Sequence, residues 1–73
     1  MSPPLTRVLW SLQRGGQSIA ALADDLGVNG IEITIVESDP PRTRRDRFLN
    51  WQLAEDWAGR ESARLRKDGW QEQ

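Results

Sequence analysis

Residues 18–36 read SIAALADDLGVNGIEITIV, and this stretch decides the fold. Its last part, residues 31–36, is rich in β-branched side chains, and apolar and polar residues alternate from Ile31 to Ile35. That pattern favours a strand. Its first part, residues 18–26, places Ile19, Leu22, Ala23 and Leu26 on one helical face, which favours a helix. The fold class therefore depends on which pattern residues 31–36 follow.

The spacing of residues 18–36 also fits a helix-turn-helix frame. Ala23 would be the small residue where two helices touch, and Gly27, four positions later, would make the turn. Asn29 would cap the second helix, because Glu32 follows at the spacing of a capping box. The segment resembles the first helix and turn of bacterial helix-turn-helix regulators. We therefore predict a mainly α fold, with α+β and residues 31–36 as a strand as the alternative.

Further helices are expected on both sides of this frame. Residues 5–14 place Leu5, Val8, Leu9 and Leu12 on one helical face. The run Asp39-Pro40-Pro41 should end an element, because a residue before proline is pushed out of the α region. Residues 43–67 are then predicted to form a long amphipathic helix, with Leu49, Leu53 and Trp57 along its apolar row.

The expected organisation is a single small domain, residues 1–73. It would consist of a helix-turn-helix-like head, residues 1–39, and an Arg/Trp-rich tail helix, residues 40–73, with a frayed C-terminus. Trp57 is expected in the core. Trp10 and Trp51 lie beside the apolar rows, so they either pack the tail onto the head or anchor a partner.

Composition restricts the chemistry. The chain has no Cys, His or Tyr, which removes thiol nucleophiles, thiolate metal sites and the commonest general base. We therefore expect that the protein is not an enzyme and that it uses no cofactor, no metal and no small-molecule substrate. No stretch approaches the roughly 20 apolar residues that span a bilayer, and the N-terminal residues do not read as a secretory signal, so no membrane contact is expected.

Charge is unevenly distributed along the chain. A six-residue window holds Arg42, Arg44, Arg45 and Arg47, opposed only by Asp46. Such a cluster attracts phosphate or an acidic protein surface, although it is also typical of a solvated linker or helix start. The predicted recognition helix carries Glu32 and Glu37 and no Arg or Lys, so docking in a DNA groove is disfavoured. We expect the head to bind a protein instead.

As a whole, the chain resembles the small RNA polymerase-binding proteins of lytic Xanthomonas phages, from Met1-Ser2-Pro3-Pro4 through the arginine cluster. The resemblance implies a phage regulator that binds the largest subunit of the host bacterial RNA polymerase. Such a regulator inhibits sigma-dependent initiation and promotes read-through of terminators, in the host bacterial cytoplasm. On physical grounds we expect such a regulator to bind polymerase near its RNA exit channel.

The candidate residues follow from charge and from the excess of Trp and Arg at binding hot spots. The partner-binding set is Leu5, Arg7, Trp10, Glu32, Glu37 and Trp51. The set expected to lie next to nascent RNA or upstream DNA is Arg42, Arg44, Arg45 and Arg47. Two alternatives stay open: a helix-turn-helix DNA-binding transcription regulator that uses the arginine cluster and the tail, and a scaffold built on the long helix.

Overall fold

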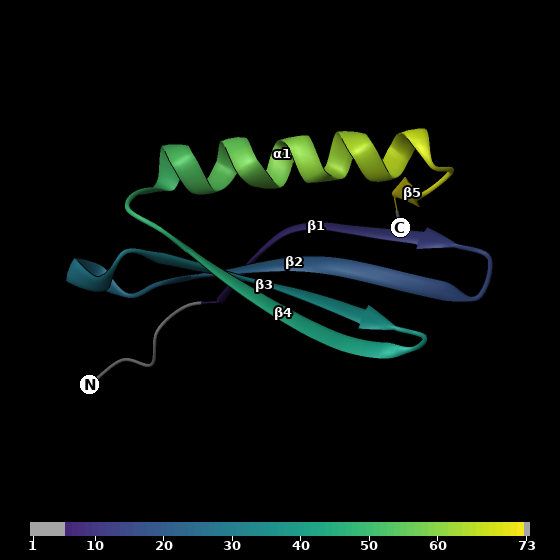
Figure 1. The fold of residues 1–73 in the computed structure, drawn as a ribbon, viewed down its shortest axis with the longest axis horizontal. Coiled ribbons are helices and arrows are strands. Elements are labelled where there is room, and N and C mark those ends of the chain that lie inside the picture. The colour runs from purple at the N-terminus through teal and green to yellow at the C-terminus, as the bar shows by residue number, and fades with distance from the viewer. Residues whose placement is uncertain (1–5, 73) are drawn as a thin grey trace.

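The computed structural model describes residues 6–72, and in that range an antiparallel sheet is covered on one face by a single α-helix (Figure 1). The elements, in chain order, are β1 (Thr6–Arg14), β2 (Gln17–Asp25), the 3-10 turn η1 (Gly27–Asn29), β3 (Ile31–Ser38), β4 (Pro41–Phe48), α1 (Trp51–Lys67) and β5 (Gln71–Glu72). The strand order is β4-β3-β2-β1-β5, with every neighbouring pair antiparallel. The first four strands therefore form a meander, and β5 returns to the edge of β1.

The prediction of a mainly α fold is wrong. Residues 18–36 form paired strands, with Ile19 opposite Glu37 at one end and Asp25 opposite Ile31 at the other. The physical reason is burial with a period of two: Ile19, Ala21 and Ala23 are buried, and the residues between them are less so. The alternative, a strand over residues 31–36, is the one that the structure has, and this strand continues to Ser38.

The residues assigned to the helix-turn-helix turn do form a turn, but one that joins two strands. The Gly27 N–H donates to Oδ1 of Asp25 at 2.8 Å, and the Leu26 N–H donates to the Gly30 carbonyl at 2.8 Å. Gly30 has φ +90°, and a Cβ there would collide with the backbone oxygen of Phe48. Glycine is therefore required at position 30, and Asn29 caps no α-helix.

The helix predicted over residues 5–14 is also replaced by a strand, β1. Its pairing with β2 shifts register between Val8 and Trp10, as in a β-bulge. After the shift, Trp10 and Leu12 stand opposite Ala21 and Ile19, which are core residues. The bulge thus brings Trp10 and Leu12 to the side of the sheet that α1 covers.

The predicted tail helix is correct only in its second part. Residues 41–48 form β4, and α1 begins at Trp51, where the Asn50 side chain accepts a hydrogen bond from the Leu53 N–H at 3.0 Å. The expected apolar row is not the buried one, because Leu49 and Leu53 are exposed. The predicted break between elements near Asp39 is confirmed, since β3 ends at Ser38.

The C-terminal end, which was expected to fray, packs against the sheet as far as the described residues reach. The Trp70 N–H donates to the Leu65 carbonyl at 3.1 Å, and the Trp70 side chain is only 8% exposed. Beyond it, β5 pairs with Leu12 and Gln13 of β1. A long-range contact with β1 therefore holds the segment that local sequence alone would leave loose.

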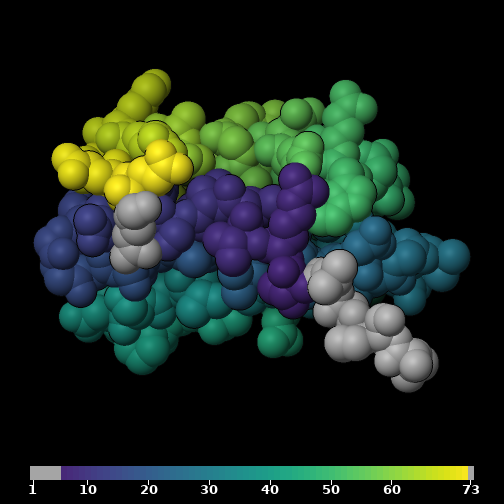
Figure 2. Space-filling view, turned by 180° about the vertical axis from the view of Figure 1, so that it is seen from behind, coloured from purple at the N-terminus to yellow at the C-terminus, as the bar shows by residue number. Residues whose placement is uncertain are grey.

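The core lies between the sheet and α1. The helix buries a row of small residues, Ala54, Ala58 and Ser62, and then Leu65, while β2 contributes Ala21 and Ala23. Small side chains on both surfaces let the helix lie close to the sheet. The larger buried side chains fill the space around them: Leu12, Ile19, Ile31, Ile33, Ile35, Leu65 and Trp70. Seen from behind, the helix atoms lie directly on those of β1, with β5 beside them (Figure 2).

Candidate binding site

A groove of about 500 Å³ lies on the helix-covered side of the sheet, between β4 and the C-terminal half of α1. Its apolar lining comes from Trp10, Ile19, Ile35, Leu65 and Trp70. Charged side chains from four elements and from the end of the helix surround this lining: Arg14, Glu37, Arg42, Arg44, Glu61, Arg64 and Asp68. The groove therefore combines aromatic surface with a concentration of guanidinium groups.

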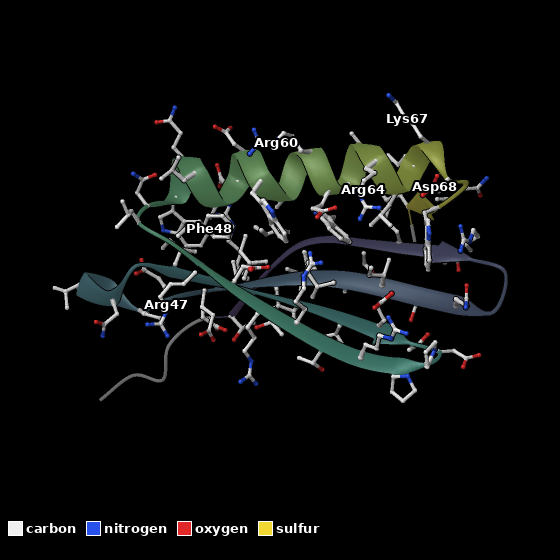
Figure 3. The ribbon with its side chains drawn as sticks, viewed as in Figure 1. Arg47, Phe48, Arg60, Arg64, Lys67 and Asp68 are labelled. Atoms are coloured by element: carbon white, nitrogen blue, oxygen red, sulfur yellow. The ribbon has the colours of Figure 1, made fainter. Side chains whose placement is uncertain are left out.

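The alternation of β4 distributes its arginines between the two faces of the sheet. Successive side chains in a strand point to opposite faces. Arg44 stands opposite the core residue Ile35, whereas Arg47 stands opposite Glu32, which lies on the other face. Figure 3 shows Phe48 between the sheet and the helix and Arg47 on the side away from the helix. Arg42 and Arg44 thus belong to the groove, and Arg45 and Arg47 to the uncovered face.

Glu61 is the electrostatic centre of the groove. Its Oε2 accepts hydrogen bonds from Nε and Nη2 of Arg64 at 2.9 and 2.7 Å, and its Oε1 lies 3.4 Å from Nη2 of Arg44. The Glu61 side chain is 19% exposed, while those of Arg44 and Arg64 are 57% and 62% exposed. One half-buried carboxylate therefore orients two accessible guanidinium groups that come from different elements.

The four arginines of β4 differ in whether their side chains have an ion-pair partner. Arg44, besides its contact with Glu61, is 3.4 Å from Asp46, and Arg47 is 3.4 Å from Glu32. The side chains of Arg42 and Arg45 are exposed and make no hydrogen bond or ion pair with any residue in the range 6–72. Their guanidinium donors are open to a ligand, one on each face of the strand.

The tryptophans connect the C-terminal part of the chain to the sheet. An arginine of a strand lies over each of three rings: Arg7 over Trp51 at 5.1 Å, Arg14 over Trp70 at 4.8 Å and Arg44 over Trp57 at 5.3 Å from the centroid. Such pairs are favourable because the ring face is electronegative. Trp57, which the sequence placed in the core, is only partly buried and packs against the core. Its ring centroid is 5.4 Å from that of Phe48.

For Trp10 and Trp51 the sequence left two roles open, packing the tail onto the rest of the chain or anchoring a partner, and in the structure both residues pack. Nε1 of Trp10 donates to the Ala58 carbonyl at 2.9 Å, and Nε1 of Trp51 lies 3.4 Å from Oδ2 of Asp25. Both rings pack against the core. Neither side chain is a freely exposed anchor.

The structure does not bring the predicted partner-binding residues together. Leu5 lies outside the described residues. Arg7 and Trp51 meet near the N-terminus of α1, where Arg7 also lies 3.5 Å from Glu55. Glu37 and Trp10 line the groove, but Glu32 is on the uncovered face.

Sequence reasoning missed four residues that build the groove: Arg14, Glu61, Arg64 and Trp70. The i,i+3 spacing of Glu61 and Arg64 was the available signal for one pair. Arg14 and Trp70 meet only through the return of β5 to β1, which no local pattern indicates.

Residues 6–72 contain neither a metal-binding cluster nor a membrane-spanning helix. No group of three or more acidic side chains there is arranged to hold a metal ion. The helix in this range is not long and apolar enough to cross a membrane.

No family model, curated protein or solved structure matches the chain.

Proposed function

We propose that this protein is a small regulator that acts by binding another protein, through the groove and β4. The observation that supports this function is the state of Arg42 and Arg45, which are exposed on an edge strand without an ion-pair partner in residues 6–72. Guanidinium groups form strong, directional hydrogen bonds with carboxylates, and arginine is enriched at binding hot spots. The partner surface should therefore be acidic.

A protein partner is favoured over a nucleic acid. Proteins that bind single strands stack bases on open aromatic rings. Here one face of each of the rings of Trp51, Trp57 and Trp70 is already covered by an arginine. The net charge of the chain is −1, whereas nucleic-acid binding is typical of a clearly basic surface. Contact of the arginine cluster with nascent RNA or upstream DNA stays a prediction with less support.

The fold does not support a helix-turn-helix DNA regulator. The second helix of its frame would follow Asn29, and residues 31–38 form the strand β3 in the interior of the sheet instead. The frame that suggested it consists of two strands and a turn.

Bacterial RNA polymerase is the partner that the sequence resemblance names, and we propose it as the target. Binding to its largest subunit near the RNA exit channel would place the protein where it can oppose sigma. Inhibition of initiation would follow if the bound state of polymerase has a lower affinity for sigma. Read-through of terminators would follow from contact with the elongating enzyme. This activity belongs in the host bacterial cytoplasm.

The test uses purified RNA polymerase core and holoenzyme, after nuclease treatment, with the protein immobilised at moderate salt. We expect retention of the core enzyme with sigma depleted. The double variant Arg42→Glu/Arg45→Glu should lose retention, and Lys67→Glu is the matched control, because Lys67 points away from the sheet (Figure 3). A core enzyme that flows through would contradict polymerase as the partner.

A further inference from the structure

We propose that β4 accepts an extended acidic segment of the partner as an added strand of the sheet. This inference rests on the proposed function and names its binding mode. In the described range, β4 is an edge strand that pairs only with β3. An edge strand offers a row of unpaired backbone N–H and C=O groups, which an incoming strand can pair with. At eight residues, β4 has the length of an ordinary strand partner.

The arginines of β4 determine what such a strand must carry. Side chains of an added strand alternate between the two faces. On the helix side they would meet Arg42 and Arg44 in the first half of β4 and Asp46 in the second, and on the uncovered side Arg45 and Arg47. Opposite charges directly across a strand pair are favourable. The complementary segment therefore has Asp or Glu on both of its faces.

The groove provides room for the side chains on the helix side. Its volume of about 500 Å³ is open beside β4 and is reached by Arg14, Arg42 and Arg64. A carboxylate that enters there can take over the guanidinium of Arg44 or Arg64 that Glu61 now holds. The groove thus contains guanidinium donors for an acidic side chain that are already oriented.

A second copy of this chain is a poor occupant of the same edge. Two antiparallel β4 strands would bring the arginines of one copy next to those of the other, and like charges across strands are destabilising. Charged edges of this kind keep sheets from associating with each other. The same charges that repel a second copy attract an acidic strand.

The experiment is an NMR titration of the ¹⁵N-labelled protein at low salt. The probe is the peptide Ac-TEEVEEVT-NH2, which presents two glutamates on each face when extended. We expect shifts concentrated in residues 41–48 and slower hydrogen exchange of the β4 amides that point away from β3. The same peptide N-methylated at its four glutamates keeps its charge but loses backbone donors, and we expect it to bind at least about tenfold more weakly.

Protein variants test the charge component separately. The double variant Arg42→Glu/Arg45→Glu should lose binding of the parent peptide by at least about tenfold, and Lys67→Glu should change it less than about twofold. Circular dichroism checks that each variant is folded; Arg42 and Arg45 have no partner in residues 6–72 to lose.

Each contrary outcome has a distinct meaning. If the N-methylated peptide binds as tightly as the parent, strand addition is overturned while a protein partner on β4 still stands. If neither peptide binds and polymerase core is retained independently of Arg42 and Arg45, strand addition on β4 is overturned and polymerase binding survives. If a single-stranded oligonucleotide of equal charge displaces the peptide at equal concentration, the acidic protein segment is overturned in favour of nucleic acid.

Discussion

The guanidinium of Arg44 lies 5.3 Å from the ring centroid of Trp57, and its Nη2 lies 3.4 Å from Oε1 of Glu61. A single side chain of β4 thus contacts α1 twice, once through a ring face and once through a carboxylate. The Arg44 side chain is 57% exposed at the rim of the groove. Arg44 therefore contributes both to the attachment of the helix and to the candidate binding surface.

The first prediction concerns the energy of the Arg44–Trp57 contact. In a double-mutant cycle with Arg44→Ala and Trp57→Ala, we expect a coupling of about 0.5–1 kcal/mol, the usual value for an exposed pair of this kind. Urea denaturation followed by circular dichroism measures it. Arg45→Ala with Trp57→Ala is the control cycle, because Arg45 lies on the other face. Additive effects in the Arg44 cycle would show that the contact between Arg44 and Trp57 contributes no coupling free energy to stability.

The second prediction concerns Glu61 as a competitor for the arginines of the groove. Glu61→Gln removes the carboxylate that holds Arg44 and Arg64, so an acidic ligand should bind about threefold to tenfold more tightly. Isothermal calorimetry with the acidic peptide measures this. Glu55→Gln is the matched control, because Glu55 pairs with Arg7 near the N-terminus of α1. Equal affinities for both variants would mean that the ligand does not use the groove.

The third prediction compares two glycines. Gly30→Ala should destabilise by about 1–3 kcal/mol, because φ is +90° and the new Cβ meets the Phe48 carbonyl. Gly59→Ala should stabilise by about 0.5–1 kcal/mol, because Gly59 is inside α1 and nothing lies within 4 Å of the added Cβ. Thermal and urea unfolding provide both values. A neutral or stabilising Gly30→Ala would contradict the turn at Gly30.

The fourth prediction concerns the close approach of α1 to the sheet. Ala58→Leu adds volume at a position that is 2% exposed, and overpacking should cost about 1–3 kcal/mol. Ala63→Leu makes the same change on the exposed side of the helix, where we expect less than about 0.5 kcal/mol. Urea unfolding compares the two variants. A tolerated Ala58→Leu would indicate that the helix is not seated on the sheet as described.

Local patterns predicted parts of the fold correctly. The alternation of Ile31, Ile33 and Ile35 indicated a strand, and all three are buried on one face. The break at Asp39-Pro40 and a helix within the tail were also correct. The arginine cluster was identified as the main basic feature, and it supplies four of the eight residues of β4.

Residues 18–26 show why the predicted fold class was wrong. Ile19, Leu22, Ala23 and Leu26 satisfy a helical period, while Ile19, Ala21 and Ala23 satisfy a strand period. Alanine favours helices, but propensity is a weak preference that tertiary packing overrides. Pairing of β2 with both β1 and β3 selected the second period.

The sequence by itself determined the chemistry available to this protein: arginines, carboxylates and tryptophans, without Cys or His. It also determined a turn that begins at Gly27 and a helix within residues 43–67, because these depend on neighbouring residues. Only the tertiary structure decided that residues 41–48 become a strand, that Arg14 meets Trp70, and that Arg44 meets Trp57 and Glu61. The physical reason is that a strand of arginines has no apolar pattern of its own. Its conformation is stabilised by hydrogen bonds to β3, a neighbour that the chain reaches only by folding.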